Sequence, residues 1–145
     1  VVPKDNAAKI EKVEDLANLD EKSKLAIGET ETVPAGQYAK ESLTNLKLWD
    51  KVESHVVYAK DVRQVRSYVE GGEAVAGFIY SSDAAGDDKI KVVQTMDEST
   101  HKKIVYPSAV IKGAANAEAA KEYEAFLKTD ASMKIFEEFG FKMAE

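Results

Sequence analysis

The sequence contains no cysteine and only two histidines among its 145 residues. Without cysteine, the chain can form no disulfide, no thiolate metal site and no cysteine nucleophile. The lack of cysteine is also compatible with an extracytoplasmic location. No apolar run approaches the roughly 20 residues that a membrane-spanning helix needs.

Positive charge is also scarce, because 20 lysines and arginines face 26 acidic residues and the net charge is −6. A sequence-independent nucleic-acid binder needs a basic face. We therefore expect no nucleic-acid partner. An anionic ligand would have to be bound by local dipoles, against a mildly repulsive overall field.

What the chain does contain is a globular composition, with 44% apolar and 32% charged residues. Its length is enough for one ordinary domain with a real core. It opens on Val1-Val2-Pro3, without a methionine or a signal peptide. We interpret this start as the end of a strand and expect the chain to be part of a longer or processed protein.

Strand-like and helix-like patterns alternate along the chain, which predicts an α/β fold with a mostly parallel sheet. Strands are expected at 25–28, 56–58, 74–80, 90–95, 104–106 and 109–111. Helices are expected at 10–18, 34–46, 62–69, 116–128 and 130–139. The last two helices are expected to bury Ala119, Tyr123, Phe126 and Leu127, and Met133, Ile135, Phe136 and Phe139.

The helix that begins at Pro34 follows the first clear strand. Proline suits the first helical position, where its missing N–H costs nothing. The backbone N–H groups of Ala35 and Gly36 are then expected among the unpaired donors of the helix N-terminus. Small side chains there would let an anion approach the backbone closely.

Two further strand ends carry similar groups. Asp61 is expected to cap the helix that begins at Val62, and Tyr80 ends the next buried strand. In α/β sheets ligands bind outside the carboxyl ends of the strands. Two helix N-termini and one phenol therefore predict a site of hydrogen-bond donors for a small anion.

A pocket of donors alone favours a fully deprotonated anion, such as molybdate, tungstate or sulfate, over a protonated phosphate. This argument requires the carboxylate of Asp61 to be used in capping. Asp83 lies close behind Tyr80, and we expect it in a turn or a helix cap. Arg63 is expected to brace a carboxylate.

Catalysis and metal binding have weaker support. A hydrolase could combine Ser81 or Ser82 with Asp83 and with His55 or His101, but the chain lacks the nucleophile-elbow motif. The two histidines are too far apart in sequence to form a short-spaced metal site. We therefore expect no enzyme, no cofactor and no metal-ligand set. The pairs Asp87-Asp88 and Glu137-Glu138 are expected on solvated faces.

Six motifs occur in the order and at the separations of one known family. They are Glu31–Glu41 (ETVPAGQYAKE), Leu48–Lys51 (LWDK), Asp61–Arg63 (DVR), Gly77–Ala84 (GFIYSSDA), His101–Pro107 (HKKIVYP) and Ile135–Phe141 (IFEEFGF). Across nearly its whole length the chain resembles the bacterial molybdate-binding proteins of ABC importers.

The resemblance implies a three-layer αβα fold of the type 2 periplasmic-binding-protein class, with crossover strands between two lobes. Residues 1–104 would form the second lobe, with 1–3 as the incoming crossover. Residues 105–145 would form the return crossover and the C-terminal part of the first lobe. The returning part, 108–145, is then expected to be either mobile or completed by another chain through segment exchange.

The resemblance also implies the ligand contacts. Molybdate or tungstate would be held by the backbone N–H groups of Ala35 and Val62 and the hydroxyl of Tyr80. Pro34, Gly36 and Asp61 would lie nearby. The family also uses two serines from the N-terminal lobe, a region that this chain lacks.

The implied function is an extracytoplasmic receptor that delivers the oxyanion to the membrane permease of an ABC importer. The receptor would be periplasmic, or extracellular and membrane-associated through a lipid anchor. Two alternatives remain, which are an oxyanion-sensing effector domain of a regulator with the same fold and a sulfate-type oxyanion receptor.

Overall fold

The computed structural model describes residues 1–143, so the last two residues of the predicted returning segment lie outside the described part. The chain divides into two compact units, Val1–Lys103 and Ile104–Glu145. The sequence-based boundary was one residue later. Whether the two units correspond to parts of two lobes stays a prediction.

The first unit is built on a parallel sheet with the strand order β3-β2-β4. The strands are β2 (Leu25–Gly28), β3 (Val56–Ala59) and β4 (Ala76–Gly77). A second, antiparallel pair joins β1 (Val2–Pro3) to β5 (Ile90–Lys91). Reciprocal hydrogen bonds of 2.9 and 2.8 Å between Val1 and Gly77 attach this pair to the free edge of β4.

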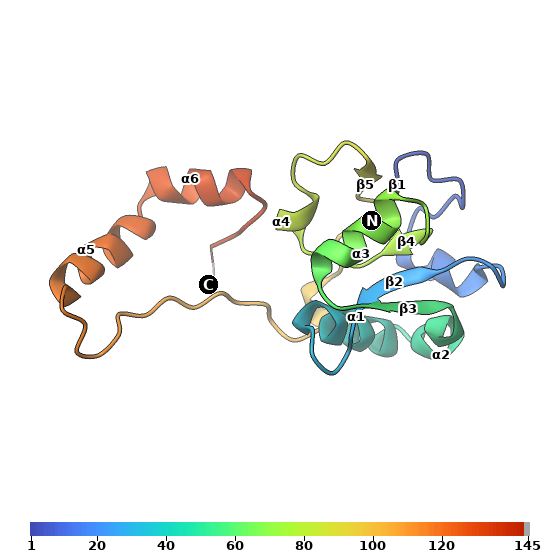
Figure 1. The fold of residues 1–145 in the computed structure, drawn as a ribbon, viewed down its shortest axis with the longest axis horizontal. Helices are drawn as coiled ribbons and strands as arrows, with labels where there is room; N and C mark the ends of the chain where they lie inside the picture. The colour runs from blue at the N-terminus through green and yellow to red at the C-terminus, as the bar shows by residue number, and fades with distance from the viewer. Residues whose placement is uncertain (144–145) are drawn as a thin grey trace. The chain divides into compact units, whose positions relative to one another are not determined.

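Two helices cover opposite faces of the parallel sheet, α1 (Pro34–Asn45) and α3 (Val62–Glu70). Alternate residues of a strand point to opposite faces. Leu25 and Ile27 of β2 share a buried cluster with α1, whereas Ala26 shares one with α3. Figure 1 shows the two helices on either side of the sheet. The predicted three-layer α/β arrangement is therefore confirmed.

Local signals explain where these helices begin and end. Pro34 is the first residue of α1, as predicted, and Lys47 ends that helix with a φ of +58°. The N–H groups of Lys47 and Leu48 bond to the carbonyls of Thr44 and Leu43, the pattern of a Schellman motif. A glycine pair ends α3, as predicted, with Gly72 at a φ of +75°.

Short elements complete the first unit. They are η1 (Val13–Asn18), α2 (Trp49–Val52), η2 (Glu53–His55), α4 (Ser81–Ala84) and η3 (Glu98–Thr100). The helix predicted at 10–18 is thus a shorter 3₁₀ helix, and a turn predicted at 81–83 is a one-turn helix.

The strands predicted at 74–80 and 90–95 are wrong in length, because β4 and β5 have two residues each. On the β4 side of β2, the last backbone hydrogen bond runs from the N–H of Phe78 to the carbonyl of Ala26, at 3.2 Å. Beyond it, β2 continues only toward β3, through a 2.8 Å bond from the N–H of Glu29 to Ala59. β4 is therefore short because the chain leaves the sheet after Phe78, although β2 continues to Gly28.

The second unit contains α5 (Ala117–Leu127) and α6 (Asp130–Glu138). Its helices agree with the prediction, and Gly140, with a φ of +81°, follows the end of α6 as expected. The strands predicted at 104–106 and 109–111 are wrong, because these residues are irregular. Strand sequences need a neighbouring strand, and the described residues of this unit contain none.

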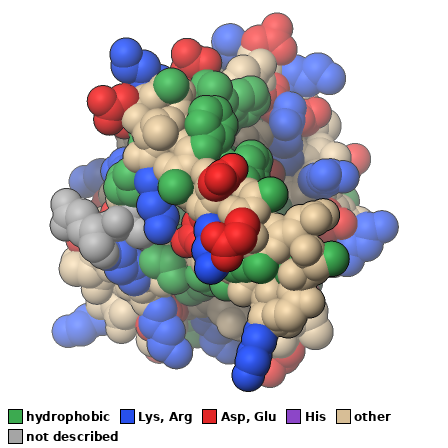
Figure 2. Space-filling view, turned by 90° about the vertical axis from the view of Figure 1, so that its left-hand side faces the viewer, with side chains coloured by type: hydrophobic (Ala, Val, Ile, Leu, Met, Phe, Trp, Pro, Cys, Tyr) green, Lys and Arg blue, Asp and Glu red, His purple; other side chains and the backbone are tan. Residues whose placement is uncertain are grey.

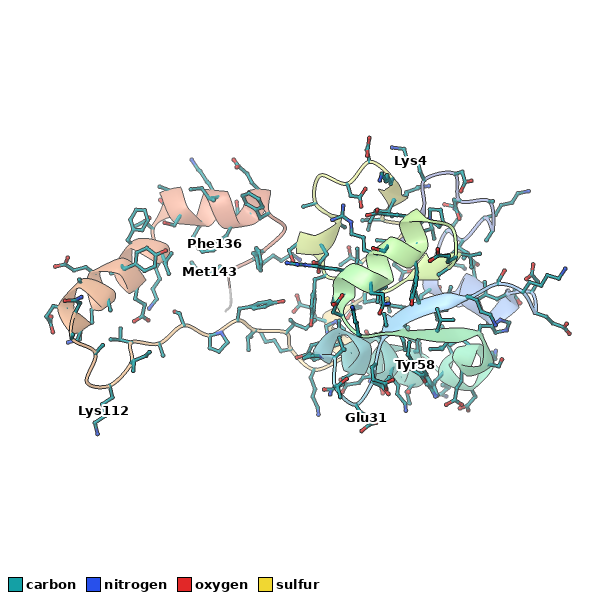
Figure 3. All side chains as sticks on the ribbon, viewed as in Figure 1. Lys4, Glu31, Tyr58, Lys112, Phe136 and Met143 are labelled. Carbon is teal, nitrogen blue, oxygen red and sulfur yellow. The ribbon has the colours of Figure 1, made fainter. Side chains whose placement is uncertain are left out.

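The buried faces predicted for the last two helices are also largely wrong. Leu127 and Met133 are half-buried, but the other predicted core residues are exposed: Ala119, Tyr123, Phe126, Ile135, Phe136 and Phe139. Phe136 packs against Phe141 with ring centroids 6.2 Å apart. Figure 2 shows hydrophobic side chains at the surface between charged residues, and Figure 3 labels Phe136 and Met143. These apolar faces have no layer to cover them within the described unit.

Candidate functional site

The carboxyl ends of the three parallel strands meet at one edge of the sheet. Gly28 of β2 is in register with Ala59 of β3, and Ala26 is in register with Gly77 of β4. The segments that carry Ala35, Val62 and Tyr80 leave the sheet at this edge. The role of these three residues as ligand contacts stays a prediction.

The first turn of α1 is packed tightly against the end of β2. A Cβ added at Gly36 would lie 2.0 Å from the carbonyl oxygen of Gly28, so only glycine fits there. The N–H of Gly36 bonds to the carbonyl of Val33 at 2.9 Å. The prediction that Gly36 offers an unpaired donor is therefore wrong, because the turn is tight enough to use that N–H internally.

Ala35 retains the donor predicted for it. Within residues 1–143 its N–H has no hydrogen-bond acceptor, and the residue is 6% exposed. Pro34, beside it, has no N–H to offer. One buried N–H group is thus directed out of the positive end of the α1 dipole.

The first turn of α3 is organised by two side chains that bond to the backbone. The Asp61 carboxylate accepts the N–H of Gln64 at 2.8 Å, and the Gln64 amide oxygen accepts the N–H of Lys60 at 2.8 Å. The predicted capping role of Asp61 is confirmed. The N–H of Val62 has no acceptor among the described residues, so this turn also presents a donor.

Tyr80 is half-buried and lies directly before α4. Its carbonyl accepts the N–H groups of Asp83 and Ala84 at 3.0 and 3.3 Å. Asp83 lies in the single turn of α4, so the prediction that it lies in a turn is confirmed. Its own carbonyl accepts a bond of 3.1 Å from Arg66 Nη1, which ties α4 to α3.

Arg66 of α3 forms ion pairs with two carboxylates, those of Glu70 and Asp87. The sequence had not pointed to this residue. Its Nε lies 2.6 Å from Glu70 Oε1 and 2.6 Å from Asp87 Oδ2. The spacing of Arg66 and Glu70, one helical turn apart, was the available signal. Arg63 is exposed and makes no ion pair within residues 1–143, so its predicted bracing role is wrong.

Asp87 also differs from the prediction of a solvated face, because its side chain is only 2% exposed. Asp88 and the pair Glu137-Glu138 are exposed, as predicted. The hydrogen bond from the N–H of Lys89 and the charge of Arg66 lower the pKa of Asp87, although desolvation opposes them. Asp87 is therefore an internal anion that stabilises the loop after α4.

The two histidines contact backbone carbonyls. His55 Nδ1 lies 3.0 Å from the Ser23 carbonyl oxygen, and His101 Nδ1 lies 2.8 Å from that of Lys102. Neither contacts Ser81 or Ser82 in the described part of the chain. The same residues contain no cluster of three or more metal-ligating side chains.

A groove of about 510 Å³ lies away from the strand ends, beside the end of α3. Its lining includes Lys4, Glu70 and Lys89, and Figure 3 labels Lys4. Its lysines are exposed and Glu70 is only half-buried, so the groove has no deeply buried polar group that would fix a ligand. The carboxyl edge of the sheet remains the stronger candidate.

A family model described as "Bacterial extracellular solute-binding protein" matches residues 1–142. The chain belongs to this family. Solute-binding proteins of this kind are binding receptors, and the expectation that the chain is not an enzyme is confirmed on that ground. The family is extracytoplasmic, and no helix among the described residues is long and apolar enough to cross a membrane.

Individual relatives carry more specific names. The chain is 47% identical over 141 residues to YvgL of Bacillus subtilis (strain 168), named as an ABC transporter substrate-binding lipoprotein; the match covers 97% of the chain and 53% of the relative. It is 41% identical over 119 residues to the molybdate-binding protein ModA of Haemophilus influenzae, covering 82% and 46%.

Among solved structures, the chain matches one titled as the substrate-binding domain of a molybdenum ABC transporter from Clostridium difficile. The TM-score is 0.88 and the identity is 48%, over 99% of this chain and 62% of the other. The predicted periplasmic-binding-protein fold is confirmed. The chain spans about half the length of the curated relatives it matches.

Proposed function

We propose that this chain contributes part of an extracytoplasmic receptor that binds molybdate or tungstate and delivers it to the permease of an ABC importer. The proposal rests on which hydrogen-bonding groups are already paired at the N-termini of α1 and α3. The carboxylate of Asp61 is used within its own turn, while the N–H groups of Ala35 and Val62 have no acceptor within residues 1–143.

This arrangement supports a doubly charged oxyanion as the ligand. Each free N–H group lies at the positive end of a helix dipole, where an anion is stabilised. A protonated phosphate would bring a donor that needs an acceptor. At the first turn of α3, Asp61 Oδ1 already accepts the N–H of Gln64, which leaves this oxygen less available to accept from such a ligand.

The relatives support molybdate among the possible dianions. The Haemophilus influenzae relative is named a molybdate-binding protein, and the Clostridium difficile structure is named for a molybdenum transporter. Tungstate has the same charge and shape, so we include it. The lipoprotein name of the Bacillus subtilis relative supports a lipid anchor, with a free periplasmic form as the other possibility.

We further propose that residues 105–143 complete a lobe whose sheet lies in a preceding part of the protein. Residues 104–111 have strand-type sequences without a strand, and large apolar side chains of this unit are exposed, among them Ile111 at 78%. The relatives are about twice as long as the chain. Two serines from the preceding part would then complete the anion site.

The experiment is calorimetric titration of molybdate, tungstate, sulfate and phosphate into this chain and into a version extended by the N-terminal lobe of the parent. We expect tight molybdate and tungstate binding only by the extended version. Each hydrogen bond to a charged group contributes about 1.5–3 kcal/mol, so losing two serines would weaken binding by roughly 10²–10⁴-fold.

A single substitution tests whether the Tyr80 hydroxyl contacts the anion. Tyr80→Phe in the extended version should weaken molybdate binding by about 1.5–3 kcal/mol, because it removes one donor to the anion. Tyr58→Phe is the matched control, since Tyr58 is a 44% exposed phenol on β3. Unchanged affinity in Tyr80→Phe would remove Tyr80 from the site. A preference for phosphate over molybdate would overturn the proposal.

A further inference from the structure

Two of the predicted contact residues follow strands that are not neighbours in the sheet. The N–H of Val62 lies at the start of α3, which follows β3, whereas Tyr80 follows β4. In the strand order β3-β2-β4, β2 separates these two strands. The backbone bonds from the β4 segment to β2 end at the N–H of Phe78, before the chain reaches Tyr80. The sheet alone therefore does not fix the distance between Val62 and Tyr80.

Arg66 connects α3 to α4 outside the sheet. It lies one helical turn after Val62, so the two residues share one side of α3. Its Nη1 donates to the carbonyl of Asp83 in α4 at 3.1 Å. The N–H groups of Asp83 and Ala84 in turn bond to the carbonyl of Tyr80, at 3.0 and 3.3 Å. Arg66 is thus joined to the backbone of Tyr80 through the single turn of α4, which lies beside α3 in Figure 1.

Arg66 is itself held in one orientation. Its Nε lies 2.6 Å from Glu70 Oε1 and 2.6 Å from Asp87 Oδ2. The Asp87 side chain is buried, and its Oδ1 accepts the N–H of Lys89 at 2.8 Å. A guanidinium group is a rigid planar fork, so fixing Nε also fixes the direction in which Nη1 points. The two carboxylates therefore direct Nη1 toward the Asp83 carbonyl.

The short helix α4 contributes little to the core. It has four residues, and none of them is buried. Its one apolar side chain, that of Ala84, is half-buried against the cluster that contains Val65 and Val69 of α3. A single helical turn is not stable by itself. The position of α4 therefore depends on hydrogen bonds to its neighbours, including the bond from Arg66.

We propose that Arg66 is a positioning residue for anion binding, which fixes the strand end at Tyr80 relative to the N–H of Val62. The inference rests on the proposed function, in which both residues contact the oxyanion. Arg66 does not act as the countercharge of the anion, because two carboxylates already neutralise its guanidinium group. Its effect is geometric, since hydrogen bonds weaken steeply when donor and acceptor are poorly aligned.

Two measurements on the version extended by the N-terminal lobe test this role. Arg66→Gln should weaken molybdate binding, measured by calorimetry, about tenfold or more, the scale found when a group that orients a contacting residue is removed. In the same variant without anion, the backbone order parameters of residues 81–84 should fall from about 0.85 toward about 0.6. Those of Val65 and Val69, in the core of α3, should stay unchanged.

Two further variants separate position from charge and from folding. Lys89→Gln removes a positive charge 3.9 Å from Glu70 Oε2, and the Lys89 side chain makes no bond to α4 among the described residues. It should change the affinity by less than about twofold. Arg66→Lys keeps the positive charge between the carboxylates, and with it the fold, but one nitrogen cannot replace both Nε and Nη1. We expect Arg66→Lys to weaken molybdate binding too.

The outcomes distinguish this inference from the proposed function. If the unchanged extended protein binds no molybdate, the proposed function fails and the positioning role fails with it. If that protein binds molybdate and both Arg66 variants bind it as tightly, only the positioning role is overturned. The positioning role is also overturned if Lys89→Gln weakens binding as much as Arg66→Gln, which would indicate an effect of charge, or if α4 stays rigid in Arg66→Gln.

Discussion

The two units of this chain use similar apolar residues in opposite ways. In residues 1–103, leucine, isoleucine and valine side chains of β2, α1 and α3 are fully buried between three layers. In residues 104–143, aromatic and aliphatic side chains of two helices are mostly exposed, including Tyr123 at 62% and Phe139 at 61%. The difference shows that an amphipathic helix is only half of a buried surface, and that the other half must come from a neighbouring layer.

The largest expected effect tests this difference in burial. Leu43→Ala removes a fully buried side chain of α1, and should lower the free energy of unfolding by about 2–5 kcal/mol. Ile135→Ala, at a residue of α6 that is 56% exposed, should change it by less than about 0.5 kcal/mol. Urea denaturation followed by circular dichroism measures both. Equal losses would mean that the second unit has a closed core.

The second prediction concerns close packing at the strand end of the first unit. Gly36→Ala places a Cβ against the carbonyl of Gly28 and should destabilise the first unit by about 1–3 kcal/mol. Gly71→Ala is the control, because its added Cβ would be 3.3 Å from the nearest atom at an ordinary φ of −81°. If the urea midpoint of Gly36→Ala is no lower than that of Gly71→Ala, the close approach of Gly36 to the Gly28 carbonyl is contradicted.

The third prediction compares one helix cap in each unit. Asp61→Ala should cost about 1 kcal/mol of stability, since it removes the 2.8 Å bond to the N–H of Gln64. Thr129→Ala removes the cap of α6, where the bond to the N–H of Ser132 is 3.4 Å. That change should lower helicity locally and leave the urea midpoint of the first unit unchanged. Site-resolved amide exchange distinguishes the two results.

The smallest expected effect is a dependence on pH confined to the first unit. The folded pKa of Asp87 is lowered, so its contribution is present above the unfolded value of about 3.9 and is lost as pH falls through the folded pKa. Asp87→Asn should therefore flatten the fall in stability below about pH 4. Urea midpoints measured from pH 7 to pH 3 test this. A steeper fall in the variant would contradict the sign.

Local signals in the sequence predicted the elements of the first unit that depend on local chemistry. Pro34 and Asp61 mark helix starts whose geometry depends on neighbouring residues only, and both predictions were confirmed. The capping of Asp61 could be predicted for the same reason, because it involves only a bond to the nearby N–H of Gln64.

Features that depend on distant parts of the chain could not be predicted. The close approach of Gly36 to the carbonyl of Gly28 depends on how α1 packs against β2, and the burial of Asp87 requires Arg66 from α3. The irregular conformation of 104–111 reflects the lack of a neighbouring strand in the described unit. A periodic sequence pattern indicates which face of a helix or strand is apolar, but it does not indicate whether another element is present to cover that face.

We propose that the N–H groups of Ala35 and Val62 together bind a tetrahedral dianion. The most direct test follows their amide resonances while molybdate is added to the protein extended by the N-terminal lobe. We expect both resonances to shift together and to stop shifting at one equivalent of molybdate. If both remain in place while the resonances of residues lining the groove beside Lys4 and Lys89 shift instead, the anion does not bind at the strand ends.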